Sequence, residues 1–426
     1  MNKMSNATTD RRTIWSPPPR PDWVTRVNQE GSYMDLSGVV PLDARSLIDT
    51  AIRNTGLTDF GSDDWREPFQ IFVKSLDEEA HLNLMGRLMG RSDILNFLQA
   101  RLQIEDTYKR HPEIDDEQIV APFLVMGQGR SGTSALLNLL AADPDNGAPK
   151  IWEAVFPCPP PEAATYRSDP RIARADKLMT MWYRVTPEVQ GVHEVDGDIP
   201  TESIHLDCLS FQSPSWLSLL GPAPSFLAYM SQRSDENVYA YEKRTLKLLQ
   251  WKNPRRRWVL KTPQYLLYIP RMLQVFPDAR FIWIHRDPVV ALSSLVNMMG
   301  TLNWVRSDKV FVDNTHAAWT TLEPIAAMMS QPIDWLEQGV LPRGQLCNVQ
   351  FQDFIKDPPG VVKQIYDHYG IDLTESQRAA LQAHVDHARH ESRPRHRYET
   401  GSSETVLKDR AAFAKYQNYF NVPNEL

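Results

Sequence analysis

One stretch constrains this chain more than any other: an apolar, strand-like run that leads directly into a glycine-containing loop and then a leucine-rich helical pattern. The run is Phe123–Met126, the loop covers 127–134, and the helical pattern continues to Leu140. In such a junction, backbone N–H groups point into the turn and the helix N-terminus adds partial positive charge. Glycines let the backbone come close to a phosphate. The stretch predicts an anion-binding loop, with a ligand-free strand-to-helix turn as the alternative.

The loop lacks the lysine that nucleotide-hydrolysing P-loops require. A Walker A sequence has lysine directly after its last glycine, whereas this chain has Thr133 after Gly132. The cation is Arg130, and Ser131, Thr133 and Ser134 add hydroxyl donors. We expect a site for a terminal phosphate group and disfavour an ATP- or GTP-hydrolysing machine.

A second strand end carries another set of anion-binding candidates. The apolar run that begins at Arg280 ends at His285, and Asp287 and Pro288 suit the cap and first position of a helix. Ser294 lies two helical turns beyond the cap and on the same face. Arg286 and Ser294 are therefore predicted to converge on a second anion. The alternative is that Arg286 pairs with an acid and Ser294 is an ordinary polar helix residue.

Further short apolar runs alternate with helical patterns. Strands are predicted at 258–261, 280–285 and 345–351, and helices at 264–276, 289–299 and about 314–329. This alternation predicts an α/β fold with a P-loop-type parallel sheet that is flanked by helices.

The chain divides into regions of different composition. Residues 1–45 suggest a loosely structured arm, and 46–118 a helical extension in which leucines recur at three- and four-residue spacings. Residues 119–426 form the predicted α/β domain. Within it, 151–250 is rich in Pro, Trp and Tyr and is interpreted as an inserted lid over the carboxyl edge of the sheet, where α/β folds bind ligands.

Composition excludes some partners. The net charge of −7 argues against a general nucleic-acid binder. Cys158, Cys208 and Cys347 are far apart, which indicates neither a disulfide framework nor a zinc site and favours a reducing, cytoplasmic location. We expect no secretory leader, no membrane span and no metal site. The oligomeric state stays open, with a homodimer as one arrangement.

The order and spacing of the motifs resemble those of a known enzyme family. RSGTS follows the first strand, LKTP occupies 260–263, and RDP begins at Arg286, with Ser294 eight residues after that arginine. This pattern resembles sulfotransferases that use 3′-phosphoadenosine 5′-phosphosulfate (PAPS). The similarity is greatest to a bacterial branch with an N-terminal helical extension, through DFGSDDW at 59–65 and RHPEI at 110–114. The resemblance covers roughly residues 45–420.

The resemblance implies a binding site for PAPS. Arg130, Ser131, Gly132, Thr133 and Ser134 would surround the 5′-phosphosulfate, and Arg286 and Ser294 would bind the 3′-phosphate. The basic segment at 393–398 matches a loop that closes over the nucleotide, so Arg395 and Arg397 join the expected cofactor contacts. Pro394 stands where many members have glycine and cannot donate a backbone hydrogen bond. A solvated basic loop is the alternative.

The same resemblance makes Arg130 and Lys261 the expected catalytic cations. Related sequences often carry Glu or His after the K-[ST]-P motif, whereas this chain has Gln264 and Tyr265, neither of which is a ready base near neutral pH.

His193 has a suitable intrinsic pKa and is the candidate base, although a single histidine is more often structural. Glu194 or Glu202 could orient it or act instead, and His205 is a weaker candidate.

The predicted function is transfer of a sulfuryl group from PAPS to a hydroxyl of a small, apolar acceptor, without a metal. Part of an aromatic set in the insertion is expected to line the acceptor pocket, although core packing explains any one member: Trp152, Phe156, Trp182, Tyr183, Phe211, Trp216 and Phe226. The alternatives are a non-catalytic or specialised PAPS-binding protein and a P-loop small-molecule kinase. Steroids, lipid alcohols, phenols and glycosides all fit as acceptors.

Overall fold

The computed structural model describes residues 10–233, 238–311, 316–390 and 396–426. At its centre lies a parallel sheet of five strands in the order β2-β3-β1-β4-β5. The strands are β1 (Phe123–Met126), β2 (Asn146–Gly147), β3 (Arg257–Lys261), β4 (Arg280–His285) and β5 (Leu346–Gln350). The predicted parallel α/β sheet is confirmed. The sequence does not reveal β2, because this two-residue edge strand has no apolar run.

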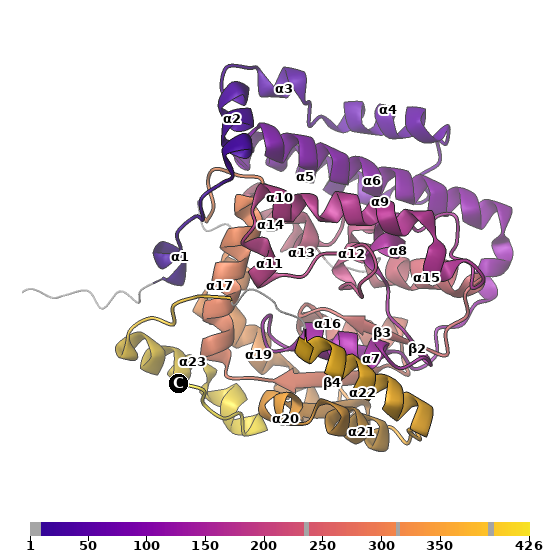
Figure 1. Cartoon of the computed structure of the whole chain (residues 1–426), viewed down its shortest axis with the longest axis vertical. Helices are drawn as coiled ribbons and strands as arrows, with labels where there is room; N and C mark the ends of the chain where they lie inside the picture. The colour runs from indigo at the N-terminus through magenta and orange to yellow at the C-terminus, as the bar shows by residue number, and fades with distance from the viewer. Residues whose placement is uncertain (1–9, 234–237, 312–315, 391–395) are drawn as a thin grey trace, which may run out of the picture.

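Side chains alternate between the two faces of the sheet, and helices cover both faces. Val125 and Ile282 pack on one side, whereas Leu124 and Phe281 pack on the other. The first face is covered by α7 (Thr133–Ala141), α21 (Pro358–His368) and α22 (Glu375–His390) (Figure 1). The second core includes α15 (Val238–Trp251), α16 (Tyr265–Val275), α17 (Pro288–Trp304), α19 (Leu322–Glu337) and α23 (Ser403–Phe420).

The N-terminal part of the chain is helical. Figure 1 shows α4, α5 and α6 at the top of the view, away from the sheet. The helices are α1 (Arg11–Ile14), α2 (Asp22–Gly31), α3 (Leu36–Val39), α4 (Ala44–Thr55), α5 (Arg66–Glu79) and α6 (Leu84–Arg110). Residues 10–45, expected to be a loose arm, thus contain short helices. Asp10 caps α1, and the buried Val24 anchors α2 in the core.

The insertion is built largely of short helices. They are α8 (Ile151–Val155), α9 (Pro170–Met179), α10 (Met181–Val185), α11 (Val189–Val192), α12 (Ile204–Asp207), α13 (Pro214–Leu217) and α14 (Pro224–Met230), before the longer α15. Its segment 201–203 lies beside the end of β3, where the Ser203 N–H donates to the Lys261 carbonyl oxygen at 2.9 Å. The insertion therefore reaches the carboxyl end of the sheet.

The predicted helices after β3 and β4 correspond to α16 and α17. The helix predicted over 314–329 instead forms α18 (Ala317–Thr320) and α19, because Thr321 between them has an extended backbone. Residues 314 and 315 lie outside the described residues. Helix α20 (Phe351–Lys356) directly follows β5. In the described ranges, no helix has both the length and the apolar character needed to cross a bilayer.

Candidate active site

The loop after β1 takes a backbone path that favours glycine. Gly127 and Gly132 have φ angles of +156° and +98°, and Arg130 has +74°. A Cβ atom on Gly132 would lie 2.9 Å from the Phe351 ring, and one on Gly127 would lie 2.8 Å from the Ile284 carbonyl oxygen. Gly132 is the N-cap of α7, so the free N–H groups of the first helical turn follow the loop. This geometry suits an anion.

The hydroxyl groups of the loop also fit an anionic ligand. The Ser131 hydroxyl is buried and has no hydrogen-bond partner within the described part of the chain. Thr133 and Ser134, at the start of α7, line the adjoining cavity. Buried polar atoms without a partner are exceptional in folded proteins. An unsatisfied hydroxyl inside a glycine loop is therefore consistent with a phosphate-binding role.

Arg130 extends from the loop towards α17 and the insertion. Its Nε donates to Ser294 Oγ at 3.0 Å, and its Nη1 donates to the Val192 carbonyl oxygen at 2.7 Å. Its Nη2 lies 3.3 Å from His396 Nδ1. Burial and the neighbouring Arg286 lower the pKa of Arg130, but a guanidinium remains charged at neutral pH. The loop thus holds a permanent positive charge.

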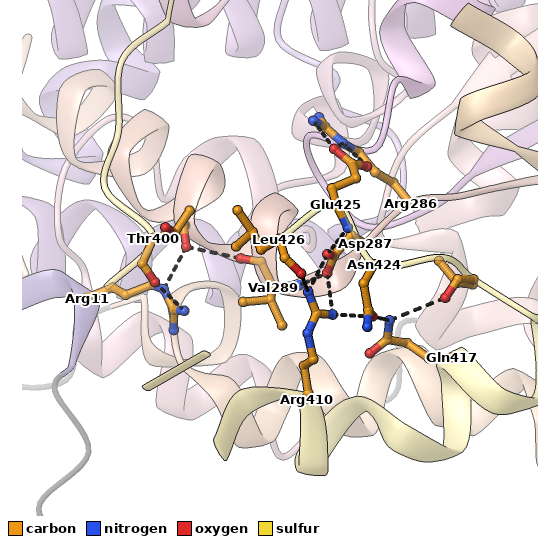
Figure 2. A network of polar contacts seen from close by, with 12 residues as sticks. Arg11, Arg286, Asp287, Val289, Thr400, Arg410, Gln417, Asn424, Glu425 and Leu426 are labelled. Carbon is orange, nitrogen blue, oxygen red and sulfur yellow. Dashed lines mark hydrogen bonds and ion pairs between the residues drawn. The ribbon is translucent and has the colours of Figure 1, made fainter. Parts of the chain in front are cut away.

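Arg286, directly after β4, is bound from two directions. Its Nη1 donates to the Arg130 carbonyl oxygen at 2.9 Å. Its Nε and Nη2 donate to the Glu425 carboxylate at 2.9 to 3.2 Å (Figure 2). The structure therefore brings Arg286 and Ser294 to the same residue, because the first contacts the backbone of Arg130 and the second its side chain. Glu425 is an acid partner of Arg286, which is the alternative to anion binding considered from the sequence.

The basic C-terminal segment contributes a different residue from those expected. Arg395 lies outside the described residues. Arg397 is exposed and lines another cavity, together with Arg11 and Tyr398. The residue that reaches the loop is His396, next to Arg397 in the chain. In the sequence, only its position inside the basic segment points to it.

His396 is held by the groups that surround Arg130. Its Nδ1 lies 3.1 Å from Ser294 Oγ, and its Nε2 lies 2.7 Å from Asn297 Oδ1. Burial and Arg130 lower the pKa of His396 to about 4, so the ring is neutral at pH 7. A neutral ring that donates from Nε2 to Asn297 leaves Nδ1 as an acceptor for Arg130 or Ser294.

Lys261 ends β3 and is buried beside the loop. It is in register with Val125 of β1, and its Nζ pairs with the Glu202 carboxylate at 2.5 Å. Burial lowers the pKa of Lys261, and Glu202 opposes this shift. The hydrogen bond from Ser203 to the Lys261 backbone holds the neighbouring Glu202 at the strand end.

Two cavities meet at this place. The polar cavity follows the loop, the start of α7, residues 190–202 and Arg286. The apolar cavity lies between Trp216 of the insertion and residues of α17 and α19. Both cavities are lined by Arg130, Thr133, Ser134, His193, Glu202 and Lys261. The charged groups therefore lie where a polar compartment opens onto an apolar one.

Comparison with known proteins identifies the family. Residues 122–375 match the sequence profile of the sulfotransferase family. This chain belongs to that family. The resemblance inferred from its motifs is confirmed, and the protein is a transferase.

Similar sulfotransferases come from mycobacteria. The omega-hydroxy-beta-dihydromenaquinone-9 sulfotransferase Stf3 of Mycobacterium bovis is 22% identical over 313 residues, which cover 69% of this chain and 73% of Stf3. The structure of STF9 from Mycobacterium avium superposes with a TM-score of 0.74 at 26% identity, covering 90% of this chain and 98% of STF9. The structure of STF1 from Mycobacterium tuberculosis superposes with a TM-score of 0.68 at 28% identity, covering 87% of this chain and 98% of STF1.

The proton acceptors predicted for this sulfotransferase lie at different places. His193 lines both cavities, and burial, Lys261 and Arg130 lower its pKa to about 4, whereas Glu202 raises it. Glu194 lines only the polar cavity. His205 lines neither cavity, because it is buried against Trp216 with 3.7 Å between ring centroids.

The two residues after the KTP motif are fixed by other contacts. The Tyr265 hydroxyl lies 2.8 Å from Ser203 Oγ and 3.0 Å from Glu242 Oε1, inside the core. Gln264 lines the apolar cavity, and the hydroxyl of Ser215 donates to its Oε1. Tyr265 thus supports the segment that carries Glu202, and Gln264 presents an amide to the acceptor side.

Only part of the predicted aromatic set lines a cavity of this sulfotransferase. Trp216 lines the apolar cavity and Tyr183 the polar one. The others pack in or against the core: Trp152, Phe156, Trp182, Phe211 and Phe226. The apolar wall not predicted from the sequence includes Met298, Met299, Trp319, Ile325 and Met328. For the two methionines, the sequence signal is only that α17 is rich in apolar residues, which is equally typical of a core helix.

Proposed function

We propose that this sulfotransferase moves a sulfuryl group from PAPS to a hydroxyl of an apolar small molecule. The observation that carries the proposal is the junction of the polar and apolar cavities at Arg130, His193, Glu202 and Lys261. Group transfer requires donor and acceptor to be held together at one point. The Stf3 relative is named for a hydroxylated menaquinone derivative, and an apolar cavity is compatible with an acceptor of that kind.

The donor would be bound at both ends by this chain's own residues. Arg130, Ser131, Gly132, Thr133 and Ser134 surround its 5′-phosphosulfate in this proposal. The positive φ angles of the glycines in the loop and the unsatisfied Ser131 hydroxyl support this assignment.

The 3′-phosphate is assigned to Arg286 and Ser294, which both contact Arg130. Arg395 and Arg397 complete the proposed contacts on family resemblance alone.

PAPS supplies the sulfuryl group and a phosphate leaving group. As the acceptor oxygen bonds to sulfur, the bond between sulfur and the bridging oxygen breaks. Arg130 and Lys261 stabilise the negative charge that develops on the leaving phosphate. His193 takes the proton of the acceptor hydroxyl. Its low pKa results partly from Arg130 and Lys261, so anions bound next to these cations raise its basicity.

The nucleotide preference tests the donor assignment. We expect calorimetry to show binding of 3′-phosphoadenosine 5′-phosphate (PAP) and little binding of ATP. Radiolabelled PAPS and a panel of steroid, lipid-alcohol, phenol and glycoside acceptors then measure sulfuryl transfer. Binding of ATP without binding of PAP would favour a kinase, and PAP binding without transfer to any acceptor would favour a specialised binding protein.

Single substitutions test the catalytic assignments. His193→Asn and Lys261→Met are each expected to lower kcat by about 100-fold or more, whereas His193→Asn leaves the affinity for PAP nearly unchanged. The exposed His368→Asn serves as the control. If Glu202→Gln abolishes turnover while His193→Asn retains it, Glu202 and not His193 is the base.

We also propose a reducing, cytoplasmic location. Cys158, Cys208 and Cys347 are free thiols, and two of them are buried, which is compatible with such a compartment. Localisation of a tagged full-length chain by cell fractionation tests this assignment.

A further inference from the structure

The guanidinium edge that Arg286 offers to an anion is covered by a carboxylate of the same chain. Glu425 Oε1 lies 3.0 Å from Nε, and Oε2 lies 2.9 Å from Nη2. Such two-point pairing is also how arginine grips a phosphate. Both side chains are largely buried, with 19% of Arg286 and 17% of Glu425 exposed, so solvent screens the pair only partly.

The backbone around Glu425 is held by contacts that do not involve its carboxylate. The Glu425 N–H donates to Asp287 Oδ2 at 2.7 Å, and Asp287 pairs with Arg410 at 2.8 Å (Figure 2). Arg410 also donates to Asn424 Oδ1 at 2.5 Å. Asp287 thereby caps α17 and anchors the C-terminal segment at once. These backbone contacts place the Glu425 carboxylate next to Arg286. Because they do not involve the carboxylate, the Glu425 side chain can rotate away from Arg286.

We propose that Glu425 competes with the 3′-phosphate of the nucleotide for Arg286 and so weakens binding of both PAPS and PAP. The proposal rests on the assignment of Arg286 to the 3′-phosphate. A carboxylate and a phosphate cannot share one edge of the guanidinium, because like charges placed side by side are strongly unfavourable. Glu425 must leave when the 3′-phosphate arrives and returns when it departs, which limits retention of the spent nucleotide.

Competition and a purely structural role predict opposite changes in nucleotide affinity when the charge of Glu425 is removed. If Glu425 only held Arg286 in place, removing its charge would weaken nucleotide binding. If Glu425 competes, removing its charge strengthens binding, and only for ligands that carry a 3′-phosphate. The anchor through the Glu425 backbone N–H is unaffected by a change of side chain, so Glu425→Gln keeps the segment docked.

Calorimetric titration of the full-length chain separates these outcomes. The ligands are PAP and adenosine 5′-phosphosulfate, which lacks the 3′-phosphate. We expect Glu425→Gln to tighten PAP binding about tenfold and to leave adenosine 5′-phosphosulfate unchanged. The exposed Glu337→Gln is the matched control. In an Arg286→Met background the effect of Glu425→Gln should vanish, because the contested cation is gone.

Unchanged or weaker PAP binding by Glu425→Gln overturns the proposal, as does equal tightening for both ligands. Glu425→Ala, with thermal melting to confirm folding, repeats the test without the hydrogen-bonding capacity of the glutamine amide. If the wild-type chain binds PAP but Glu425→Gln does not tighten it, only this inference fails. If neither wild type nor variants bind PAP, the PAPS-dependent function fails as well.

Discussion

His285 shows how a single buried side chain links the sheet to the C-terminal helix. It is the last residue of β4, with Nδ1 3.0 Å from the Tyr416 hydroxyl and Nε2 2.9 Å from Asn348 Oδ1. Burial lowers the pKa of His285 to about 4, whereas the hydrogen bond that the ring donates to the Asn348 side-chain oxygen raises it. The folded chain therefore keeps this ring neutral under conditions in which an unfolded histidine takes up a proton.

This pKa predicts acid sensitivity. Between about pH 6.5 and 4 the unfolded chain binds a proton at His285 that the folded chain does not, so stability falls as the pH decreases. From pH 7 to 5 the expected loss from this residue is about 2 kcal/mol. Urea unfolding of wild type and His285→Gln at both pH values measures it. The variant should lose correspondingly less stability on acidification, and an equal loss would contradict the assignment. The exposed His368→Gln should behave like wild type.

The site residues that sequence could predict are those fixed by local structure. Arg130 and Lys261 follow from the position of a loop or a strand end, and their neighbours in the sheet follow from parallel register. The partners of Arg130 and Arg286 could not be predicted in the same way. His396 and Glu425 come from segments more than 130 residues away, and Glu425 belongs to no recognisable motif. Long-range contacts between polar side chains leave no periodic signal in a sequence.

At the scale of elements, local patterns predict buried strands and long helices well and interruptions poorly. β1, β3 and β4 have the buried apolar runs that a sheet covered on both faces requires, whereas the edge strand β5 exposes Asn348. The break between α18 and α19 depends on the extended backbone of one residue, Thr321, in an otherwise helical segment. The short helices of the insertion are likewise held by tertiary packing, since isolated helices of this length are unstable.

The loop between β1 and α7 predicts a strong effect of a small substitution. Gly132→Ala places a Cβ atom 2.9 Å from the Phe351 ring at a φ of +98°, which is strained for any L side chain. We expect a loss of about 1 to 3 kcal/mol in unfolding free energy and much weaker PAP binding. Gly339→Ala is the control, because its φ is also positive but a Cβ atom there meets nothing within 4 Å. Equal effects of the two variants on PAP affinity would argue against a special role of the loop.

At the scale of the whole molecule, segments from both ends of the sequence close around α17. Arg11 of α1 pairs with Asp409 of α23, and its Nε donates to Ser293 Oγ of α17 at 2.7 Å. Its Nη2 donates to the Thr400 carbonyl oxygen at 3.1 Å. The fold thus places the N-terminal segment against the loop that carries His396.

The Arg11–Asp409 pair predicts that the two ends stabilise each other. Arg11 is 6% exposed and Asp409 1%, and burial raises the pKa of this carboxyl. Arg11→Ala leaves a buried carboxylate without its cation, so we expect a loss of about 3 to 5 kcal/mol in unfolding free energy, measured by urea denaturation. Arg45→Ala, which removes an exposed pair at 3.8 Å, should cost less than about 0.5 kcal/mol. The double variant Arg11→Leu/Asp409→Leu should be more stable than Arg11→Ala, because no charge remains buried without a partner. If the double variant is the less stable of the two, the unpaired charge of Asp409 is not what destabilises Arg11→Ala.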